Sequence, residues 1–492
     1  MEPVISIKPL LAVLVSLLAV PILVSSRTPN VREAWTFVAA SIKFLIVASM
    51  LPAVLRGEQL AYTLAEVIPG APIAFRVDAL GMLFALVASS LWIVTTAYSI
   101  GYMRGLKEHS QTRYFCFFAI ALSSTIGVAF SANLLTLYLF YEMLSLATYP
   151  LVTHHQDGEA RSSGRKYLVY ILGTSIGLVL PAMIISYNLC GTLTFSDHGF
   201  LSGTGPGWLM GALLLMFVFG FAKAAVIPFH GWLPAAMVAP TPVSALLHAV
   251  AVVKVGVFSI VRVLTGVFGL EMLSTLNLST IVCVMASSTI LIASLIALSQ
   301  DNLKRLLAFS TIGQLSYIVL GVGLLSPKGI TGGLLHIAMH AFGKITLFFC
   351  AGAIFVATGK RNISEMTGIG KRMPVTMTAF FIGALSITGL PPAGGFLSKW
   401  YLVLGSLEAH HMAVLGVLLL SSLLNAAYFM PIVYRAFFCP AEKSMFENRV
   451  QEAPSFCVVP LTFTAFISLL LLFYPEPFFS LASMVARGMT GG

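Results

Sequence analysis

Long apolar stretches separated by short polar loops follow one another along almost the whole chain. A helix needs about 20 apolar residues to cross the hydrocarbon core of a bilayer. Stretches of roughly that length lie near residues 7–25, 34–55, 78–103, 114–130, 134–153, 167–190, 208–228, 243–265, 277–298, 305–325, 331–357, 376–404, 412–437 and 456–474. The pattern predicts an all-α polytopic membrane protein with about fourteen transmembrane helices.

The two ends of the chain need separate interpretation. Lys8 precedes the first apolar stretch and small residues follow it, as in a signal peptide. The cleavage site is weak, so an uncleaved span is favoured. The apolar segment after Glu476 is too short to cross a bilayer, and we expect it at the surface.

Two of the apolar stretches contain residues that break helices. The segments Val226–Leu233 (VIPFHGWL) and Leu390–Leu397 (LPPAGGFL) share the pattern Pro-x-x-Gly-aromatic-Leu. The breaking residues are Pro228 and Gly231 in the first, and Pro391, Pro392 and Gly395 in the second. Interrupted spans at corresponding places in two halves indicate the ion site of a transporter built from repeats.

Composition excludes a soluble domain, because 58% of the 492 residues are hydrophobic, only 9% are charged and the mean hydropathy is +0.94. The six cysteines form no Cys-x-x-Cys pair, and no nucleotide-binding or hydrolase motif is present. We therefore expect no metal, no cofactor and no redox or hydrolytic site in this chain. The net charge of +10 does not indicate nucleic-acid binding, because the basic residues are not clustered in a soluble domain but are sorted by membrane side.

Lysine and arginine are distributed unequally between the two sets of loops. Loops 26–33, 104–113, 154–166, 299–305, 358–375 and 435–455 hold seventeen of the 28 basic residues, whereas the other loops and both termini hold six. The positive-inside rule assigns the richer set to the cytoplasm. The sequence thus predicts a multi-pass protein of the cell (inner) membrane with both termini on the outer face.

The charges inside the apolar stretches are the strongest indication of function. Five lysines remain there, and Glu142 is the single acid centred in a span; the lysines are Lys43, Lys223, Lys254, Lys344 and Lys399. A lysine at the bilayer centre costs roughly 2.5–3.5 kcal/mol and needs a partner or a water-filled cavity. Two alternatives remain open: Lys223 extends to the interface, or Glu142 is protonated and bonded to a neighbouring helix.

A stripe of titratable residues is predicted on one helix. His336, His340 and Lys344 are spaced at i, i+4 and i+8 and therefore share a face. This favours proton transfer over metal binding, because no third ligand is nearby, although two core histidines bonded to backbone carbonyls remain an alternative. His248 is a similar candidate on another helix, and we interpret His230, His154 and His155 at span ends as interfacial.

Five motifs carry a resemblance to a known family. They are YEMLSLATYPLV around Glu142, FAKAAVIPFHGWLPAAMVAPTPVSALLHA around Lys223, QDNLKRLLAFSTIGQLSY from Gln300, HIAMHAFGKITLFF, and GLPPAGGFLSKWYL. With these motifs the chain, from about Asp78 to Phe438, resembles the antiporter-like membrane subunits of respiratory complex I, of Mrp sodium/proton antiporters and of membrane-bound hydrogenases. The likeness is strongest to the D component of the Mrp antiporters.

The resemblance implies fourteen helices with two inverted five-helix repeats, in which helices 7 and 12 are broken. We expect helices 1–3 in residues 1–113, the repeats in 114–265 and 266–437, and a loop, helix 14 and a surface segment in 438–492. It also implies that Glu142 pairs with Lys223, that Lys254 connects the halves, and that Lys399 is the terminal lysine.

The resemblance implies proton translocation, with Na⁺/H⁺ exchange, by a subunit that assembles with other integral membrane subunits. The alternative is a subunit that pumps protons inside a redox-driven complex. An autonomous solute symporter is disfavoured, because five cations and a single acid suit a proton relay better than solute binding.

Overall fold

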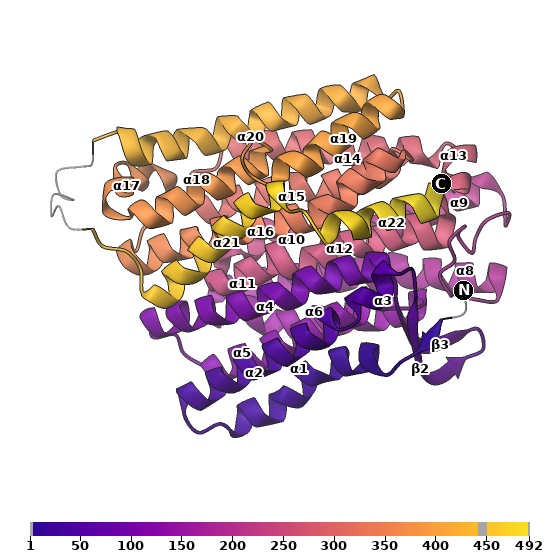
Figure 1. The fold of residues 1–492 in the computed structure, drawn as a ribbon, viewed down its shortest axis with the longest axis horizontal. Coiled ribbons are helices and arrows are strands. Elements are labelled where there is room, and N and C mark those ends of the chain that lie inside the picture. The colour runs from indigo at the N-terminus through magenta and orange to yellow at the C-terminus, as the bar shows by residue number, and fades with distance from the viewer. Residues whose placement is uncertain (1–2, 441–449, 491–492) are drawn as a thin grey trace.

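The computed structural model describes residues 3–440 and 450–490 and is predominantly helical (Figure 1). The α-helices are α1 Lys8–Ser25, α2 Pro29–Ala48, α3 Leu51–Leu55, α4 Ala79–Gly105, α5 Gln111–Ala129, α6 Leu134–Val152, α7 Gly158–Thr174, α8 Leu180–Cys190, α9 Gly207–Gly220, α10 Trp232–Ala235, α11 Thr241–Ala245, α12 Val252–Arg262, α13 Leu270–Thr275, α14 Leu278–Leu298, α15 Leu303–Gly323, α16 Pro327–Thr358, α17 Ile369–Arg372, α18 Pro374–Thr388, α19 Gly395–Glu408, α20 Met412–Phe438, α21 Ser455–Phe473 and α22 Phe478–Thr490. Short 3₁₀ or π turns are η1 Ser175–Val179, η2 Ala222–Ala224, η3 Ala236–Val238, η4 Leu246–Val250, η5 Val263–Phe268 and η6 Ile363–Met366.

The helical membrane fold is confirmed. Within the described residues, twelve helical segments are long and apolar enough to cross a membrane, and two shorter apolar helices, α9 and α18, accompany them. Each of the fourteen predicted stretches coincides with one of these helices. The two short helices are those that end at the predicted breaks.

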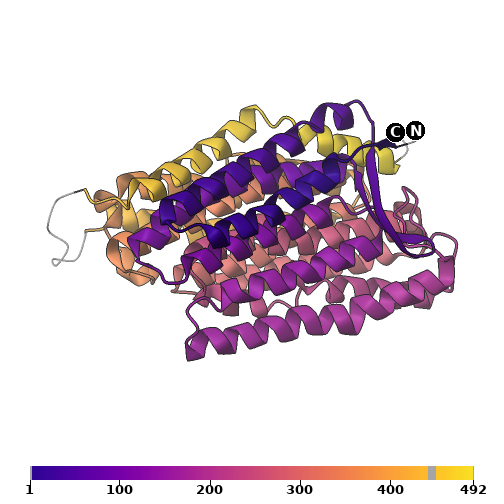
Figure 2. The same cartoon turned by 90° about the horizontal axis from the view of Figure 1, so that it is seen from below.

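The long helices run side by side along the bundle, and both termini lie at the same end (Figures 1 and 2). We call this the terminal end. Residues of the predicted basic loops, among them Leu106, His155, Asn302 and Arg361, line one cavity at the opposite end, which we call the basic end. Two termini at one end of the bundle are what the predicted even number of spans requires.

The centre of the bundle is formed by α16, α15 and the segment from α11 to η5. α16 has 32 residues and contacts α15, α18, α19 and α21. The most apolar windows of Thr241–Phe268 and of α15 are entirely buried within the protein, whereas only 33% of the corresponding window of α20 is buried. Charged side chains on the central helices are therefore removed from lipid by other helices.

Several helices begin at a side chain that caps their first turn. Such caps satisfy backbone N–H groups that have no partner within the helix. The capping side chains are Asp78 for α4, Asn133 for α6, Asp157 for α7, Asn302 for α15 and Ser326 for α16.

Two features of the fold were not predicted. Between the second and third apolar stretches, and before the first, the chain builds a sheet of β1 Val4–Ile5, β2 Leu60–Ile68 and β3 Ala71–Val77, in which β1 pairs parallel with β2 and β2 pairs antiparallel with β3. These strands are shorter than a membrane span, so hydropathy does not detect them. The segment after Glu476 forms α22, whose apolar face packs on α4 and α16.

Candidate functional site

Both predicted helix breaks are present in the structure. α9 ends at Gly220, the single turn η2 holds Lys223, and the chain resumes at α10. α18 ends at Thr388 and α19 begins at Gly395, with Lys399 one turn further on. A Cβ on Gly395 would lie 1.8 Å from the carbonyl oxygen of Ser386, so only glycine permits this close return of the chain.

Lys223 is fully buried beside α6 and does not extend to an interface. Its Nζ donates to the carbonyl oxygen of Tyr141 and to Oγ of Ser145, both at 2.7 Å, and lies 3.1 Å from the centroid of the Tyr141 ring. A carbonyl, a hydroxyl and an aromatic face together replace the hydration of the ammonium.

Glu142 does not pair directly with Lys223 in this structure. Among the described residues, neither carboxylate oxygen of Glu142 has a hydrogen-bond partner, although both oxygens are buried. The ammonium of Lys223 instead donates to the oxygen atoms of Tyr141 and Ser145, which lie on the same helix as Glu142. The expected pair is thus two neighbouring buried groups without a direct bond.

The histidine stripe joins four helices. Lys254 Nζ on α12 lies 2.9 Å from Nδ1 of His340 on α16. One turn away on α16, His336 contacts Ser398 Oγ of α19 through Nδ1 at 2.8 Å and Gln314 Oε1 of α15 through Nε2 at 3.1 Å. The ring centroids of the two histidines are 5.7 Å apart.

Two further lysines, Lys344 and Lys399, lie at the edges of this cluster. Lys344 Nζ donates to Ser310 Oγ at 2.8 Å, and Tyr428 Oη of α20 donates to the same hydroxyl at 3.1 Å. Lys399 Nζ donates to the carbonyl oxygen of Thr388 at 3.0 Å. That carbonyl belongs to the last residue before the second break, so the break itself provides the acceptor.

Two of the predicted site residues are less well connected. Both ring nitrogens of His248 lack a partner among the described residues, and the ring packs 4.7 Å from that of Phe348. Among the residues that the structure describes, no hydrogen bond joins Lys223 to Lys254. Their backbones are close, however, because a Cβ on Gly256 would lie 2.1 Å from the backbone nitrogen of Ala224.

A cavity at the basic end leads toward the first break. It has a volume of about 870 Å³, is lined by Lys166, His230 and Lys304, and reaches Gly231 and Pro234. His230, which we interpreted as interfacial, thus faces this cavity together with several cations. The cavity connects the polar loops with the interrupted part of the membrane segment.

Sequence reasoning missed the neutral partners of the charged residues. They are Tyr141, Ser145, Ser310, Gln314 and Ser398. All five lie inside the motifs quoted above. The signal that could have found them is the presence of uncharged polar residues within those motifs.

Comparison with known proteins places the chain among membrane subunits of ion-translocating complexes. Residues 131–425 match the family described as NADH:quinone oxidoreductase/Mrp antiporter, TM. The chain is 34% identical over 440 residues to NADH-quinone oxidoreductase subunit N of Desulforudis audaxviator, covering 87% of this chain and 86% of that protein.

Other relatives are longer than this chain. It is 31% identical to the A subunit of a Na⁺/H⁺ antiporter of Alkalihalophilus pseudofirmus over 77% of its own length, and spans about half (49%) of that relative. It is also 31% identical to hydrogenase-4 component B of Escherichia coli, covering 82% of this chain and 62% of that protein. These relatives do not test the special likeness to the D component of the Mrp antiporters, which stays a prediction.

Two solved structures share the fold. The Mrp complex of Dietzia sp. DQ12-45-1b has a chain with a TM-score of 0.82, 22% identity and coverage of 98% of this chain and 96% of that one. A chain of the archaeal membrane-bound sulfane sulfur reductase has a TM-score of 0.86, 24% identity and coverage of 99% and 98%. The family that the motifs predicted is confirmed: the chain belongs to the NADH:quinone oxidoreductase/Mrp antiporter transmembrane family.

Proposed function

We propose that this chain is a proton-translocating subunit of a multi-subunit membrane complex that exchanges a cation such as Na⁺ for protons. The observation that carries the proposal is the buried contact series from Lys254 through His340 and His336 to Ser398. It crosses from the first half of the chain to the second, and Ser398 directly precedes Lys399.

The residue types in this series suit proton transfer. An imidazole can accept a proton on one nitrogen and release one from the other, and a lysine can act as a neutral acceptor or a charged donor. Internal water commonly completes such networks at buried polar groups. We assign translocation to Glu142, Lys223, Lys254, His248, His336, His340, Lys344 and Lys399.

The role of Glu142 is electrostatic. Its carboxylate lies on α6, the helix whose Tyr141 and Ser145 accept hydrogen bonds from Lys223, and a negative charge there stabilises the ammonium through a low-dielectric interior. When that negative charge is withdrawn, Lys223 releases its proton more readily toward the second half of the chain. The absence of a direct bond between the two groups leaves Glu142 free to change its interaction during turnover.

A second candidate function is proton pumping within a redox-driven complex. It is supported by the likeness to NADH-quinone oxidoreductase subunit N, which extends over 86% of that protein. Chemical composition of the purified complex separates the two: iron–sulfur or flavin partners support redox coupling, and their absence from an active exchanger supports antiport.

For the placement in the cell, we propose the cell membrane, with the basic end in the cytoplasm and both termini on the outer side. The excess of lysine and arginine in one set of loops supports this orientation. Relatives named as subunits of antiporters and oxidoreductases support partnership with other integral membrane subunits.

The test uses Lys254→Met, which retains the length and apolar stem of the side chain but removes its charge. We expect a loss of about tenfold or more in pH-gradient-driven Na⁺ flux in vesicles that contain the assembled complex, because His340 loses its proton donor. Lys328→Met, at an exposed position paired loosely with Glu408, is the matched control and should retain flux. Normal flux in Lys254→Met would exclude the series from the pathway.

A further inference from the structure

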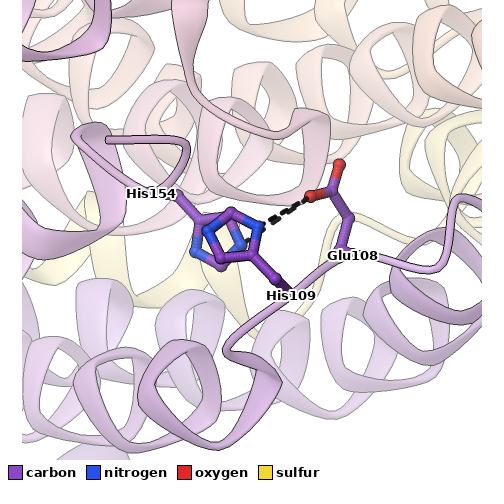
Figure 3. Close-up of side chains that lie close together, drawn as sticks. All are labelled: Glu108, His109 and His154. Atoms are coloured by element: carbon purple, nitrogen blue, oxygen red, sulfur yellow. Dashed lines mark ion pairs between the residues drawn. The ribbon is translucent and has the colours of Figure 1, made fainter. Parts of the chain in front are cut away.

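A cluster of one carboxylate and three imidazoles lies at the basic end, outside the proposed proton pathway. Glu108 and His109 belong to the loop between α4 and α5, and His154 and His155 follow the end of α6 (Figure 3 shows the first three). Glu108 Oε2 lies 3.9 Å from His109 Nδ1, 3.9 Å from His154 Nε2 and 3.7 Å from His155 Nδ1. The ligand atoms of Glu108, His109 and His154 all lie within 4.8 Å of one another.

Two side chains of α5 hold the backbone of the cluster in place. Arg113 Nη2 donates to the carbonyl oxygen of His154 at 2.8 Å, which ties the end of α6 to the first turn of α5. The Nε2 of Gln111 donates to the carbonyl oxygen of Glu108 at 3.1 Å. The loop that presents Glu108 and the residues after α6 are thereby fixed relative to each other.

His154 is the residue that points to a ligand. Its side chain is completely buried, yet neither ring nitrogen has a hydrogen-bond partner among the described residues. Buried polar groups almost always have a partner, so an imidazole of this kind requires an explanation. Its Nε2 is directed at the carboxylate of Glu108, toward which the other two imidazoles also converge.

The donor set identifies the class of ligand. Three imidazole nitrogens and one carboxylate oxygen suit Zn²⁺ and related transition metals, whereas Mg²⁺ and Ca²⁺ prefer oxygen ligands alone. With bonds of about 2.0–2.1 Å, the donor atoms of a tetrahedral zinc site are about 3.3 Å apart. The carboxylate-to-imidazole distances are 3.7–3.9 Å, and the donor atoms of Glu108, His109 and His154 are spread over up to 4.8 Å. Zinc binding therefore requires the side chains of His109 and His155, which are 51% and 34% exposed, to turn inward toward the ion.

We propose that Glu108, His109, His154 and His155 form a binding site for one Zn²⁺ ion per chain. The four protein ligands complete a tetrahedron, so the ion has a structural role and fastens the α4–α5 loop to the end of α6. Glu108 and His155 also line the 870 Å³ cavity at the basic end, so the ion lies at its rim. This site is separate from the His336 and His340 pair and does not depend on the proposed transport activity.

The first test measures metal binding to the purified full-length chain. Protein stripped with a chelator is incubated with Zn²⁺, freed of excess metal by gel filtration and analysed for bound zinc, and its affinity is measured by competition with a zinc indicator. We expect one tightly bound Zn²⁺ and a loss of affinity of at least about tenfold in His109→Ala and in His155→Ala, because loss of even a second-shell partner of a metal typically costs that much. These two ligands are exposed, so their replacement should leave folding intact.

Controls separate this site from other metal-binding groups. His198→Ala, at an exposed histidine in the loop between α8 and α9, should bind zinc as the unaltered chain does. Six free cysteines could also bind zinc, so X-ray absorption should show nitrogen and oxygen ligands without sulfur. Unchanged zinc affinity in a His109→Ala/His155→Ala double variant, or sulfur ligation in the unaltered chain, would overturn the proposal.

Discussion

The buried lysines of this chain are held mainly by neutral atoms. The partners are Ser16 for Lys43, Tyr141 and Ser145 for Lys223, His340 for Lys254, Ser310 for Lys344 and Thr388 for Lys399. A carboxylate partner would be left as an unpaired buried charge when the lysine releases its proton, at a large energetic cost. A carbonyl, hydroxyl or imidazole partner avoids that cost, so neutral partners are compatible with repeated protonation and deprotonation.

Lys399 provides the sharpest test at the residue scale. If its charge must be lost during turnover, Lys399→Ala should stop transport, and Lys399→Arg should reduce flux by about tenfold or more because a guanidinium stays protonated. Flux driven by a pH gradient, normalised to assembled complex, is the measurement. Lys328→Arg, at an exposed position, is the matched control.

The opposite result has a definite meaning. If Lys399 is only a structural cation, an arginine at this position can donate to the carbonyl of Thr388 equally well. Near-normal flux in Lys399→Arg would therefore remove this lysine from the pathway. Loss of assembly in Lys399→Ala alone would then identify the residue as a support for the second helix break.

Sequence identified the buried charges but not their immediate partners. A lysine in an apolar stretch is conspicuous because its cost must be compensated. Gln314 and Ser398 are not conspicuous, since many serines and threonines in these helices bond only to a carbonyl of their own helix, as Ser259 does. The pairing of Glu142 with Lys223 is an expectation from family resemblance, and the side-chain conformation that decides it has no sequence signal.

At the scale of elements, Gly256 controls the distance between α12 and the first break. An added Cβ would meet the backbone nitrogen of Ala224 at 2.1 Å and the backbone carbon of Lys223 at 2.3 Å. Gly256→Ala should therefore destabilise the protein by about 1–3 kcal/mol, as expected for overpacking. Thermal unfolding in detergent measures the change.

The matched control is Gly416→Ala in α20, where an added Cβ meets nothing within 4 Å. This variant should be neutral or slightly stabilising, because alanine favours a helix over glycine by about 1 kcal/mol. Equal melting temperatures for the two variants would show that α12 can move away from the break without cost.

An ion pair at the terminal end joins α4 to α12. Arg262 donates to both carboxylate oxygens of Asp78 at 2.6 Å, and the backbone N–H of Gly81 donates to the same carboxylate at 2.8 Å. Burial alone would raise the pKa of Asp78, but Arg262, with Arg76 and the Gly81 N–H, holds that pKa below its usual range. Unfolding therefore raises the pKa, and the folded state is stabilised above the unfolded value of about 3.9.

This stabilisation should disappear as the pH falls through the lowered pKa of Asp78. Asp78→Asn retains a capping side chain but leaves Arg262 without its partner, and should lose about 3 kcal/mol at neutral pH. The unaltered protein should show a decrease in melting temperature below about pH 4, and the variant should lose part of that decrease. Identical acid profiles for both proteins would contradict this account.

The long helices were predictable because the hydropathy of a whole span is a long, redundant signal. Short elements lack such a signal and were not predictable. Each of the fourteen apolar stretches has a helix at its place, and proline with glycine marked both breaks. The strands β2 and β3 were missed because nine and seven residues between two strong helical signals do not stand out. The surface placement of α22 stays a prediction, and the contact of its apolar face with α4 and α16 was not predictable because those helices are distant in sequence.

At the scale of the whole molecule, the ends of the bundle predict membrane topology. The C-terminus and α17, which belongs to the loop after α16, lie at opposite ends of the bundle (Figure 1). A reporter fused after Gly359, among Lys360, Arg361, Lys371 and Arg372, should report the cytoplasm, and a fusion at the C-terminus should report the opposite side. Enzyme reporters that are active on only one side of the membrane provide the measurement, and both fusions on one side would refute fourteen crossings.

The hydroxyl of Ser398 can form a hydrogen bond with His336 in either protonation state of the ring. Its oxygen lies 2.8 Å from His336 Nδ1 and 3.1 Å from the carbonyl oxygen of Gly395, but it carries a single hydrogen. When His336 is neutral, its proton is on Nε2 toward Gln314, and the Ser398 hydroxyl donates to Nδ1. When Nδ1 is also protonated, the hydroxyl accepts from the ring and turns its hydrogen to the carbonyl of Gly395. Both charge states of the ring are accommodated by rotation about one C–O bond, with every heavy atom in place. The carbonyl oxygen of Gly395, in the first turn after the second helix break, thus accepts the hydroxyl hydrogen of Ser398 whenever His336 does not.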